Sequence, residues 1–173
     1  MNKKTTIILV VAVNLILIAS IIALYFTVFN NNTNEWSLTI TGEVENDVVL
    51  SIDELVTLPN ITRSYLLQGN PTFTAEYTGV SLNYLITEIA NITENVRVRV
   101  IAVDQYSYTF NFENDLVNNS EIIIAYLKNG EYIKSRSKGG EGPLRLIIPQ
   151  RFEGEFNGQY CVKYVNTIEI LAV

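Results

Sequence analysis

The 173-residue chain has 12 lysines and arginines against 18 aspartates and glutamates, one cysteine and no histidine. The absence of histidine excludes Ser-His-Asp triads, His-ligated haem and most zinc sites. The single cysteine excludes CxxC redox motifs, cysteine-ligated iron–sulfur clusters and an internal disulfide, and the excess of acids makes nucleic acid a poor partner.

The N-terminal segment predicts a membrane anchor. Two lysines precede a mostly apolar run from Thr5 to Phe29, and about 20 apolar residues suffice to cross a bilayer. Lysines on this side favour a cytoplasmic N-terminus. We therefore expect a cytoplasmic segment at 1–4, a single transmembrane signal anchor at 5–29, a polar linker at 30–35 and an extracytoplasmic domain at 36–173, held at the cell membrane. A cleaved signal peptide is the alternative, and it also places the domain outside the cytoplasm.

The first half of the domain predicts short strands and two short helices. A capping box of Ser51 and Glu54 indicates a helix at 51–58, and an amphipathic pattern indicates a second helix at 81–90 with Ser81 as its N-cap. Alternating or β-branched and aromatic segments predict strands at 36–44, 62–67, 96–103 and 106–112, the last two as a hairpin.

The second half predicts further strands. Asn129-Gly130 is typical of a tight hairpin turn, because this dipeptide accepts the positive φ angles that such a turn requires. The fold class that we expect is α+β, a strand-rich mixed β domain with short helices, preceded by one transmembrane helix. The strands of this half are expected at 121–127, 131–135, 144–149 and 160–171, the last segment as one strand or two.

Three features of the domain bear on chemistry. The stretch KSRSKGGEGPLR, from Lys134 to Arg145, combines glycines that expose backbone N–H groups with cations that bind phosphate, so it is either an anion-binding loop or a solvated hairpin loop. Asp104 follows a predicted strand and is either a turn-forming residue or a site residue. Cys161 lies within a predicted strand and is expected to be a small buried apolar side chain.

Five motifs occur in one order over nearly all of 36–171. They are WSLTITGEVENDVVLSIDELVTLP, YTGVSLNYLI, AYLKNGEYI, EGPLRLIIP and VKYVNTIEI. They resemble motifs of the molybdopterin-binding domain of the sulfite oxidase family (oxidoreductase molybdopterin-binding domain). The resemblance implies the strand-rich fold of that domain and, as cofactor, molybdenum bound by the dithiolene of a phosphate-bearing pterin. We expect neither haem nor an iron–sulfur cluster.

The resemblance also implies cofactor contacts. Arg145 matches the arginine that contacts the pterin, and Cys161, Val162 and Lys163 match a short run whose backbone and lysine hold it.

Two departures from the family pattern concern the metal. The family segment LQCxGN contains the cysteine that ligates molybdenum, but this chain has LQGN at 67–70. The histidine of the family motif HGxPxR falls near Gly140. Neither Gln68 nor Asn70 can replace a thiolate as a soft metal ligand. We therefore expect no protein ligand to a metal, and the cofactor-binding residues implied are Arg145, Lys163, Val162, Cys161, Gly140, Gln68 and Asn70.

Three functions stay open. The first is a membrane-anchored, extracytoplasmic, molybdopterin-binding oxidoreductase-like domain that diverges at the metal site. The second is a non-catalytic module that keeps the fold and binds an anion, a pterin or a protein partner. The third is a structural or interaction domain on the cell surface. Whether the protein is an enzyme is open, and so is the identity of any electron-transfer or surface protein partner.

Overall fold

The computed structural model describes residues 36–93 and 95–173, together with Asn14, Ile18 and Ser20, which are helical. The chain divides into two compact units, Met1–Glu35 and Trp36–Val173. Apart from those three residues, the predicted cytoplasmic segment, anchor and linker lie outside the described residues. Within the described part of the chain, no helix is both long and apolar enough to span a bilayer. The anchor stays a prediction.

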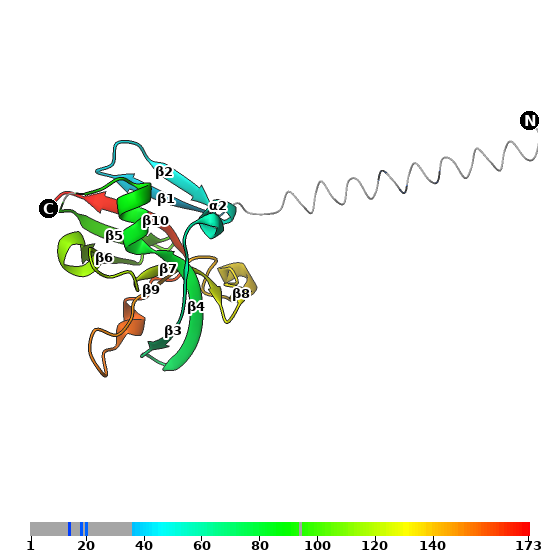
Figure 1. Ribbon diagram of the computed structural model, residues 1–173. Coiled ribbons are helices and arrows are strands. Elements are labelled where there is room, and N and C mark those ends of the chain that lie inside the picture. Colours follow the sequence, from blue (N-terminus) through cyan, green and yellow to red (C-terminus); the bar gives the residue numbers. More distant parts are fainter. Residues whose placement is uncertain (1–13, 15–17, 19, 21–35, 94) are drawn as a thin grey trace, which may run out of the picture. The chain divides into compact units, whose positions relative to one another are not determined.

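The first sheet of the domain joins both ends of the domain's sequence. It has the order β2-β1-β10-β5-β6. β1 pairs parallel with β10, and the other neighbouring pairs of the sheet are antiparallel (Figure 1). The β5–β6 hairpin confirms the predicted pairing of these segments. The strands are β1 (Ser37–Gly42), β2 (Val48–Ser51), β5 (Arg97–Ala102), β6 (Ser107–Asn111) and β10 (Val165–Leu171).

The second sheet has the order β3-β4-β7-β8, and β9 pairs with the other end of β7. The predicted turn between β7 and β8 is confirmed, because Asn129 and Gly130 have φ angles of 53° and 79°. Figure 1 shows β4 as a long curved strand that runs beside β3. The strands are β3 (Ile61–Leu67), β4 (Phe73–Ser81), β7 (Ile123–Lys128), β8 (Glu131–Tyr132) and β9 (Arg145–Ile147).

The alternation of apolar and polar residues that predicted the strands matches an alternation of buried and exposed side chains in the structure. In β5, Val98 and Val100 are fully buried whereas Arg97 is exposed. Such side chains from both sheets belong to one apolar cluster, with Ile168 from β10 and Ile123 from β7 among its fully buried members. The expectation of a strand-rich mixed β domain with short helices is therefore confirmed.

The short helices follow the sequence signals in part. In α2 (Ile52–Thr57), the hydroxyl of Ser51 accepts from the N–H of Glu54 at 3.2 Å, and the Glu54 carboxylate accepts from the N–H of Ser51 at 2.8 Å. This is the predicted capping box. The second helical segment is α3 (Leu82–Tyr84), which continues as the π-helical turn η1 (Leu85–Ile89).

Ser81 stands at the predicted N-cap position of the second helix, but its side chain makes no cap hydrogen bond. Ser81 is the last residue of β4, and its hydroxyl is buried without a hydrogen-bond partner among the described residues. The N–H of Leu82 instead donates to the carbonyl of Ile122 at 2.8 Å. The segment before β7 thus satisfies the first N–H of the helix.

The remaining helical segments are single turns. They are η2 (Phe112–Leu116), η3 (Arg136–Lys138) and η4 (Asn157–Gln159).

Gly79 lies where β4 passes close to β7. A Cβ atom at this position would be 2.3 Å from the carbonyl oxygen of Ile124 and 2.6 Å from Cα of Ala125. Because both obstacles are backbone atoms of a paired strand, we expect Gly79→Ala to lower the free energy of unfolding by about 3 kcal/mol. Urea denaturation followed by circular dichroism measures this loss.

Gly130→Ala is the matched control. A Cβ atom at Gly130 meets nothing within 4 Å, and only the positive φ of 79° opposes it, at a cost of about 1 kcal/mol. Equal losses in the two variants would contradict the expected clash.

Candidate functional site

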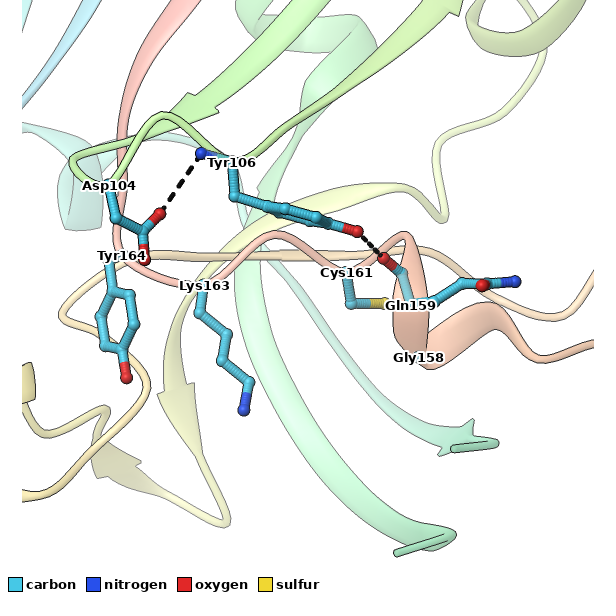
Figure 2. Close-up of a pocket in the computed structure, with 7 residues that line it drawn as sticks. All are labelled: Asp104, Tyr106, Gly158, Gln159, Cys161, Lys163 and Tyr164. Carbon is cyan, nitrogen blue, oxygen red and sulfur yellow. Dashed lines mark hydrogen bonds between the residues drawn. The ribbon is translucent and has the colours of Figure 1, made fainter. Parts of the chain in front are cut away.

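A pocket of about 260 Å³ lies where the turn after β5 meets the segment before β10. The turn contributes Asp104 and Tyr106, and the Asp104 carboxylate accepts from the N–H of Tyr106 at 3.3 Å. The Tyr106 hydroxyl donates to the carbonyl of Gln159 across the pocket wall (Figure 2). The seven lining residues are Asp104, Tyr106, Gly158, Gln159, Cys161, Lys163 and Tyr164. Asp104 thus forms the turn and also lines the pocket.

Tyr164 makes the chain bend at the pocket. Its φ angle is 58°, in the left-handed region that a bulky residue seldom adopts. Three hydrogen bonds hold it: its N–H donates to Glu141 O at 3.2 Å, its carbonyl accepts from Val103 N at 3.1 Å, and its hydroxyl donates to Gly140 O at 3.1 Å. The predicted strand at 160–171 is therefore wrong over its first part, and β10 begins only after this bend.

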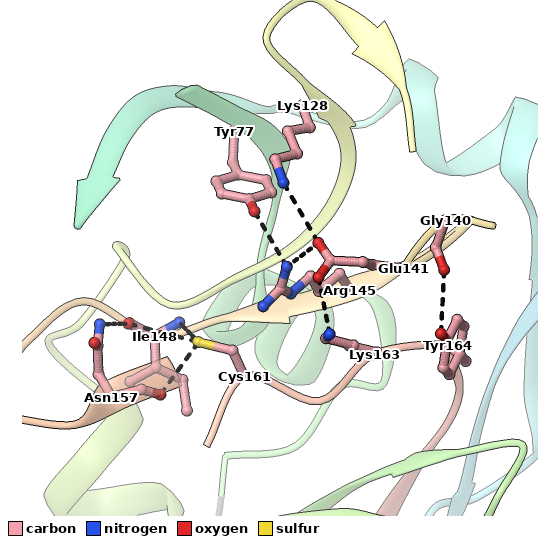
Figure 3. A network of polar contacts seen from close by, with 10 residues as sticks. All are labelled: Tyr77, Lys128, Gly140, Glu141, Arg145, Ile148, Asn157, Cys161, Lys163 and Tyr164. Atoms are coloured by element: carbon pink, nitrogen blue, oxygen red, sulfur yellow. Dashed lines mark hydrogen bonds and ion pairs between the residues drawn. The ribbon is translucent and has the colours of Figure 1, made fainter. Parts of the chain in front are cut away.

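Three cations surround one carboxylate beside the pocket, and we call Lys128, Glu141, Arg145 and Lys163 the charge cluster. Lys163 Nζ lies 2.9 Å from Glu141 Oε1, and Lys128 Nζ lies 3.4 Å from Oε2. The Arg145 guanidinium contacts the same Oε2 and also donates to the hydroxyl of Tyr77 at 3.3 Å (Figure 3). Lys163 belongs to both the charge cluster and the pocket, so the two features form one site.

Arg145 is a deeply buried member of the charge cluster. Its side chain is 3% exposed, and its Nε atom is a buried donor with no hydrogen-bond partner among the described residues. The backbone of Arg145 pairs with the backbone of Lys163 in an isolated antiparallel β-bridge. Burial raises the pKa of the neighbouring Tyr77 to about 12, so this phenol stays neutral at physiological pH.

Cys161 is buried as predicted, but it lies in a bend and not in a strand. Its Sγ accepts from the N–H of Ile148 at 3.3 Å and donates to the carbonyl of Asn157 at 3.4 Å. Burial raises the pKa of the Cys161 thiol against the lowering effect of the Ile148 hydrogen bond. The side chain is thus a neutral thiol at neutral pH, and a metal binds the thiolate form.

Gln68 reaches the pocket wall, whereas Asn70 does not. The Gln68 carbonyl accepts from Gly158 N at 3.0 Å, and a Cβ atom at Gly158 would lie 2.8 Å from that oxygen. The Gln68 side chain accepts from Gln150 Nε2 at 3.0 Å. Asn70 is exposed in the loop that follows β3.

The structure thus brings together most of the predicted cofactor-binding residues. Cys161 and Lys163 line the pocket, and the carbonyl of Gly140 accepts from the hydroxyl of pocket-lining Tyr164. Val162 is fully buried, and its carbonyl accepts from the N–H of Leu146 at 2.8 Å. In the loop predicted to bind an anion, Lys134, Arg136 and Lys138 are exposed, whereas Glu141 and Arg145 turn inward to the charge cluster.

Asn157 is a site residue that the sequence did not reveal. It is fully buried, and its Nδ2 donates to the carbonyls of Leu66 and Ile148 at 2.9 and 2.8 Å, while its Oδ1 accepts from Gln68 N at 2.9 Å. It therefore fastens the end of β3 to the segment that lines the pocket. An Asn-Gly dipeptide signals only a turn, so no signal in the sequence pointed to this role.

The described residues offer no ready metal site. They contain no group of three or more histidine, cysteine, aspartate or glutamate side chains placed to hold a metal ion. What they do offer is a cationic cluster next to a pocket with two tyrosines, which suits an anion attached to a planar or apolar group.

The chain belongs to the oxidoreductase molybdopterin-binding domain family, which matches residues 25–173. The resemblance drawn from the motifs is therefore confirmed. Among solved structures, the sulfane dehydrogenase SoxCD from Paracoccus pantotrophus has the same fold, with a TM-score of 0.65 and 20% sequence identity. The alignment covers 80% of this chain and 38% of that chain, so this chain spans well under half of the length of that relative. A comparison with curated proteins gave no match.

The pKa of Glu141 gives the charge cluster a defined pH dependence. Burial raises this pKa, but the hydrogen bond from Lys163 and the charges of Arg145, Lys163 and Lys128 lower it more, so the folded value lies below 4.5. Ionised Glu141 therefore contributes its full stabilisation of the folded state above pH 4.5. This contribution to the free energy of unfolding is lost as the pH falls through the lower pKa of the folded state.

We expect the free energy of unfolding to fall on acidification in this window, by about 1.4 kcal/mol for each unit of the pKa shift. Glu141→Gln should flatten this part of the curve, measured by urea denaturation between pH 3 and pH 6, a range of roughly 1.5 units on each side of the ordinary carboxyl pKa. An unchanged slope in the variant would show that the cluster does not carry the effect.

Proposed function

We propose that this domain binds a phosphate-bearing ligand of the pterin class without supplying a protein ligand to a metal. The observation that carries the proposal is Lys163, whose side chain lines the pocket and belongs to the charge cluster. A ligand in the pocket would place its phosphate against this lysine and its ring beside Tyr106 and Tyr164.

The anionic end of such a ligand fits the residues present. The charge cluster has three cations and one carboxylate, which leaves two net positive charges. The unpartnered Nε of buried Arg145 is an additional donor, and an unmet buried donor costs about 1–3 kcal/mol. Arg145 and Lys163 would hold the phosphate, because charge-assisted hydrogen bonds to phosphate are the strong ones.

The metal end does not fit. The pocket has one sulfur, that of Cys161, and it is a buried, hydrogen-bonded thiol whose pKa is raised. Gln68 and Asn70, which by resemblance flank the place of the missing ligand cysteine, have amide side chains, and neither lines the pocket. A molybdenum ion would receive no thiolate from the described residues, and we derive no redox step at this site. Sulfane dehydrogenation, the activity in the name of SoxCD, is a property of that protein.

Lys163→Met tests the proposal. The Lys163 side chain is 46% exposed, so its replacement removes a charge with little effect on the core. Protein produced in a host that makes molybdopterin should carry bound pterin without stoichiometric molybdenum, both measured on the purified protein. We expect Lys163→Met to weaken pterin retention roughly tenfold or more, as the loss of a charged hydrogen bond predicts.

Lys138→Met is the matched control, because Lys138 is exposed in the same region and does not line the pocket. It should retain pterin like the unmodified protein. Stoichiometric molybdenum would contradict the proposed metal-free binding. The absence of any pterin or phosphate binding would contradict the proposal as a whole.

We also propose that the domain lies outside the cytoplasm, anchored at the cell membrane by residues 5–29. The support is the pair of lysines before the apolar run and the length of that run. Protease added to intact spheroplasts should therefore degrade the domain while a cytoplasmic marker survives. Survival of both until lysis would contradict this location.

A further inference from the structure

The Glu141 carboxylate occupies the cations that a ligand phosphate would use. Both of its oxygens are engaged, Oε1 by Lys163 and Oε2 by Arg145 and Lys128. A carboxylate that bridges several cations in this way has the interactions of a bound phosphate oxyanion. Figure 3 shows the carboxylate between the three cationic groups.

Backbone hydrogen bonds hold the loop at Glu141, whereas the Glu141 side chain is held by the three cations of the charge cluster. The Glu141 carbonyl accepts from Tyr164 N at 3.2 Å, and the N–H of Gly142 donates to Lys134 O at 2.8 Å. A Cβ atom at Gly140 would lie 2.0 Å from that same carbonyl oxygen, so the loop is packed closely against its neighbour. The Glu141 side chain is 27% exposed, so rotation about its side-chain bonds would bring the carboxylate to solvent while the loop backbone stays in place.

We propose that Glu141 is a built-in competitor for the anion site, which a ligand displaces when it binds. The inference rests on the proposed function, since it concerns the same site. While the Glu141 carboxylate is in place, an arriving anion meets a like charge within the charge cluster. When the carboxylate leaves, the three cations have no counter-ion. Only a ligand with more than one negative charge gains enough to exchange with a carboxylate, so Glu141 selects phosphate esters and pyrophosphate over simple monoanions.

The experiment is a titration of the full-length protein with inorganic pyrophosphate at constant ionic strength, followed by calorimetry. We expect Glu141→Gln, which keeps the shape of the side chain and removes its charge, to bind pyrophosphate at least about tenfold more tightly than the unmodified protein. We also expect the unmodified protein to bind pyrophosphate but not acetate, and the variant to bind both.

Glu169→Gln is the matched control. Glu169 pairs with Arg99 on the first sheet, and its side chain has the same 27% exposure as that of Glu141. It should bind pyrophosphate like the unmodified protein. A gain of equal size in both variants would show a general effect of net charge and would overturn the inference.

The outcomes separate the two proposals. If the unmodified protein binds pyrophosphate and Glu141→Gln binds it equally or less tightly, Glu141 is only a structural counter-ion for buried Arg145, and the inference is overturned while the proposed function stands. If neither protein binds, the proposed function itself fails.

Loss of Glu141 also removes the counter-ion of a buried arginine, so folding of the variant is checked by circular dichroism and by its unfolding midpoint. If Glu141→Gln does not fold, Glu141→Asp replaces it, because aspartate keeps the charge and withdraws the carboxylate by one methylene group. The expected result is then tighter pyrophosphate binding than in the unmodified protein, and equal binding overturns the inference.

Discussion

Arg145 imposes the constraint on which this part of the domain depends. It is a charged side chain in β9, a strand whose three residues are all buried. An unpaired charge in such a place costs several kcal/mol, so β9 packs in the core with an anionic partner for Arg145. Glu141 supplies that partner from four residues earlier in the chain, and the pairing of β9 with β7 brings Lys128 to the same group. The course of the loop before β9 thus follows from one buried cation.

A second, uncharged constraint holds the other side of the pocket. The amide of Asn157 bonds to backbone groups of two segments, to Leu66 and Gln68 at the end of β3 and to Ile148 just after β9. An amide side chain both donates and accepts hydrogen bonds, so one residue can bind backbone N–H and carbonyl groups of different segments. The pocket is therefore held by two polar networks, the ionic charge cluster and the uncharged hydrogen bonds of Asn157.

The features that could be predicted from the sequence are those that depend on residues close together in the chain. The alternation in β5, the capping box of Ser51 and the Asn129-Gly130 turn are all decided within a few residues, and all are present. Asn157 contacts residues 89 and 91 positions away, and no local pattern encodes such partners. The carbonyl of Ile122, which accepts from the first N–H of the helix after Ser81, is another partner that lies far away in the sequence.

For the site, the motif resemblance located the cations but not their counter-ion. Arg145 and Lys163 were expected to hold a ligand, and they do lie together, yet they are joined through Glu141. A carboxylate in a glycine-rich loop gives no indication of whether it points to solvent or inward. Its direction was set by the desolvation of Arg145, a property of the folded core that the sequence does not display.

The strained backbone at Tyr164 connects these constraints to the pocket. A bulky residue in the left-handed region costs about 1–2 kcal/mol, and such a conformation persists only where the surroundings over-determine it. Here the N–H, the carbonyl and the hydroxyl of Tyr164 are each bonded to a different residue. The bend separates Lys163, which belongs to the ionic side of the site, from β10, which belongs to the core of the first sheet. Without it the chain would enter β10 in an extended form, and the side chains of Lys163 and Tyr164 would point to opposite faces as successive residues of a strand do. The strain is therefore what allows both side chains to line one pocket.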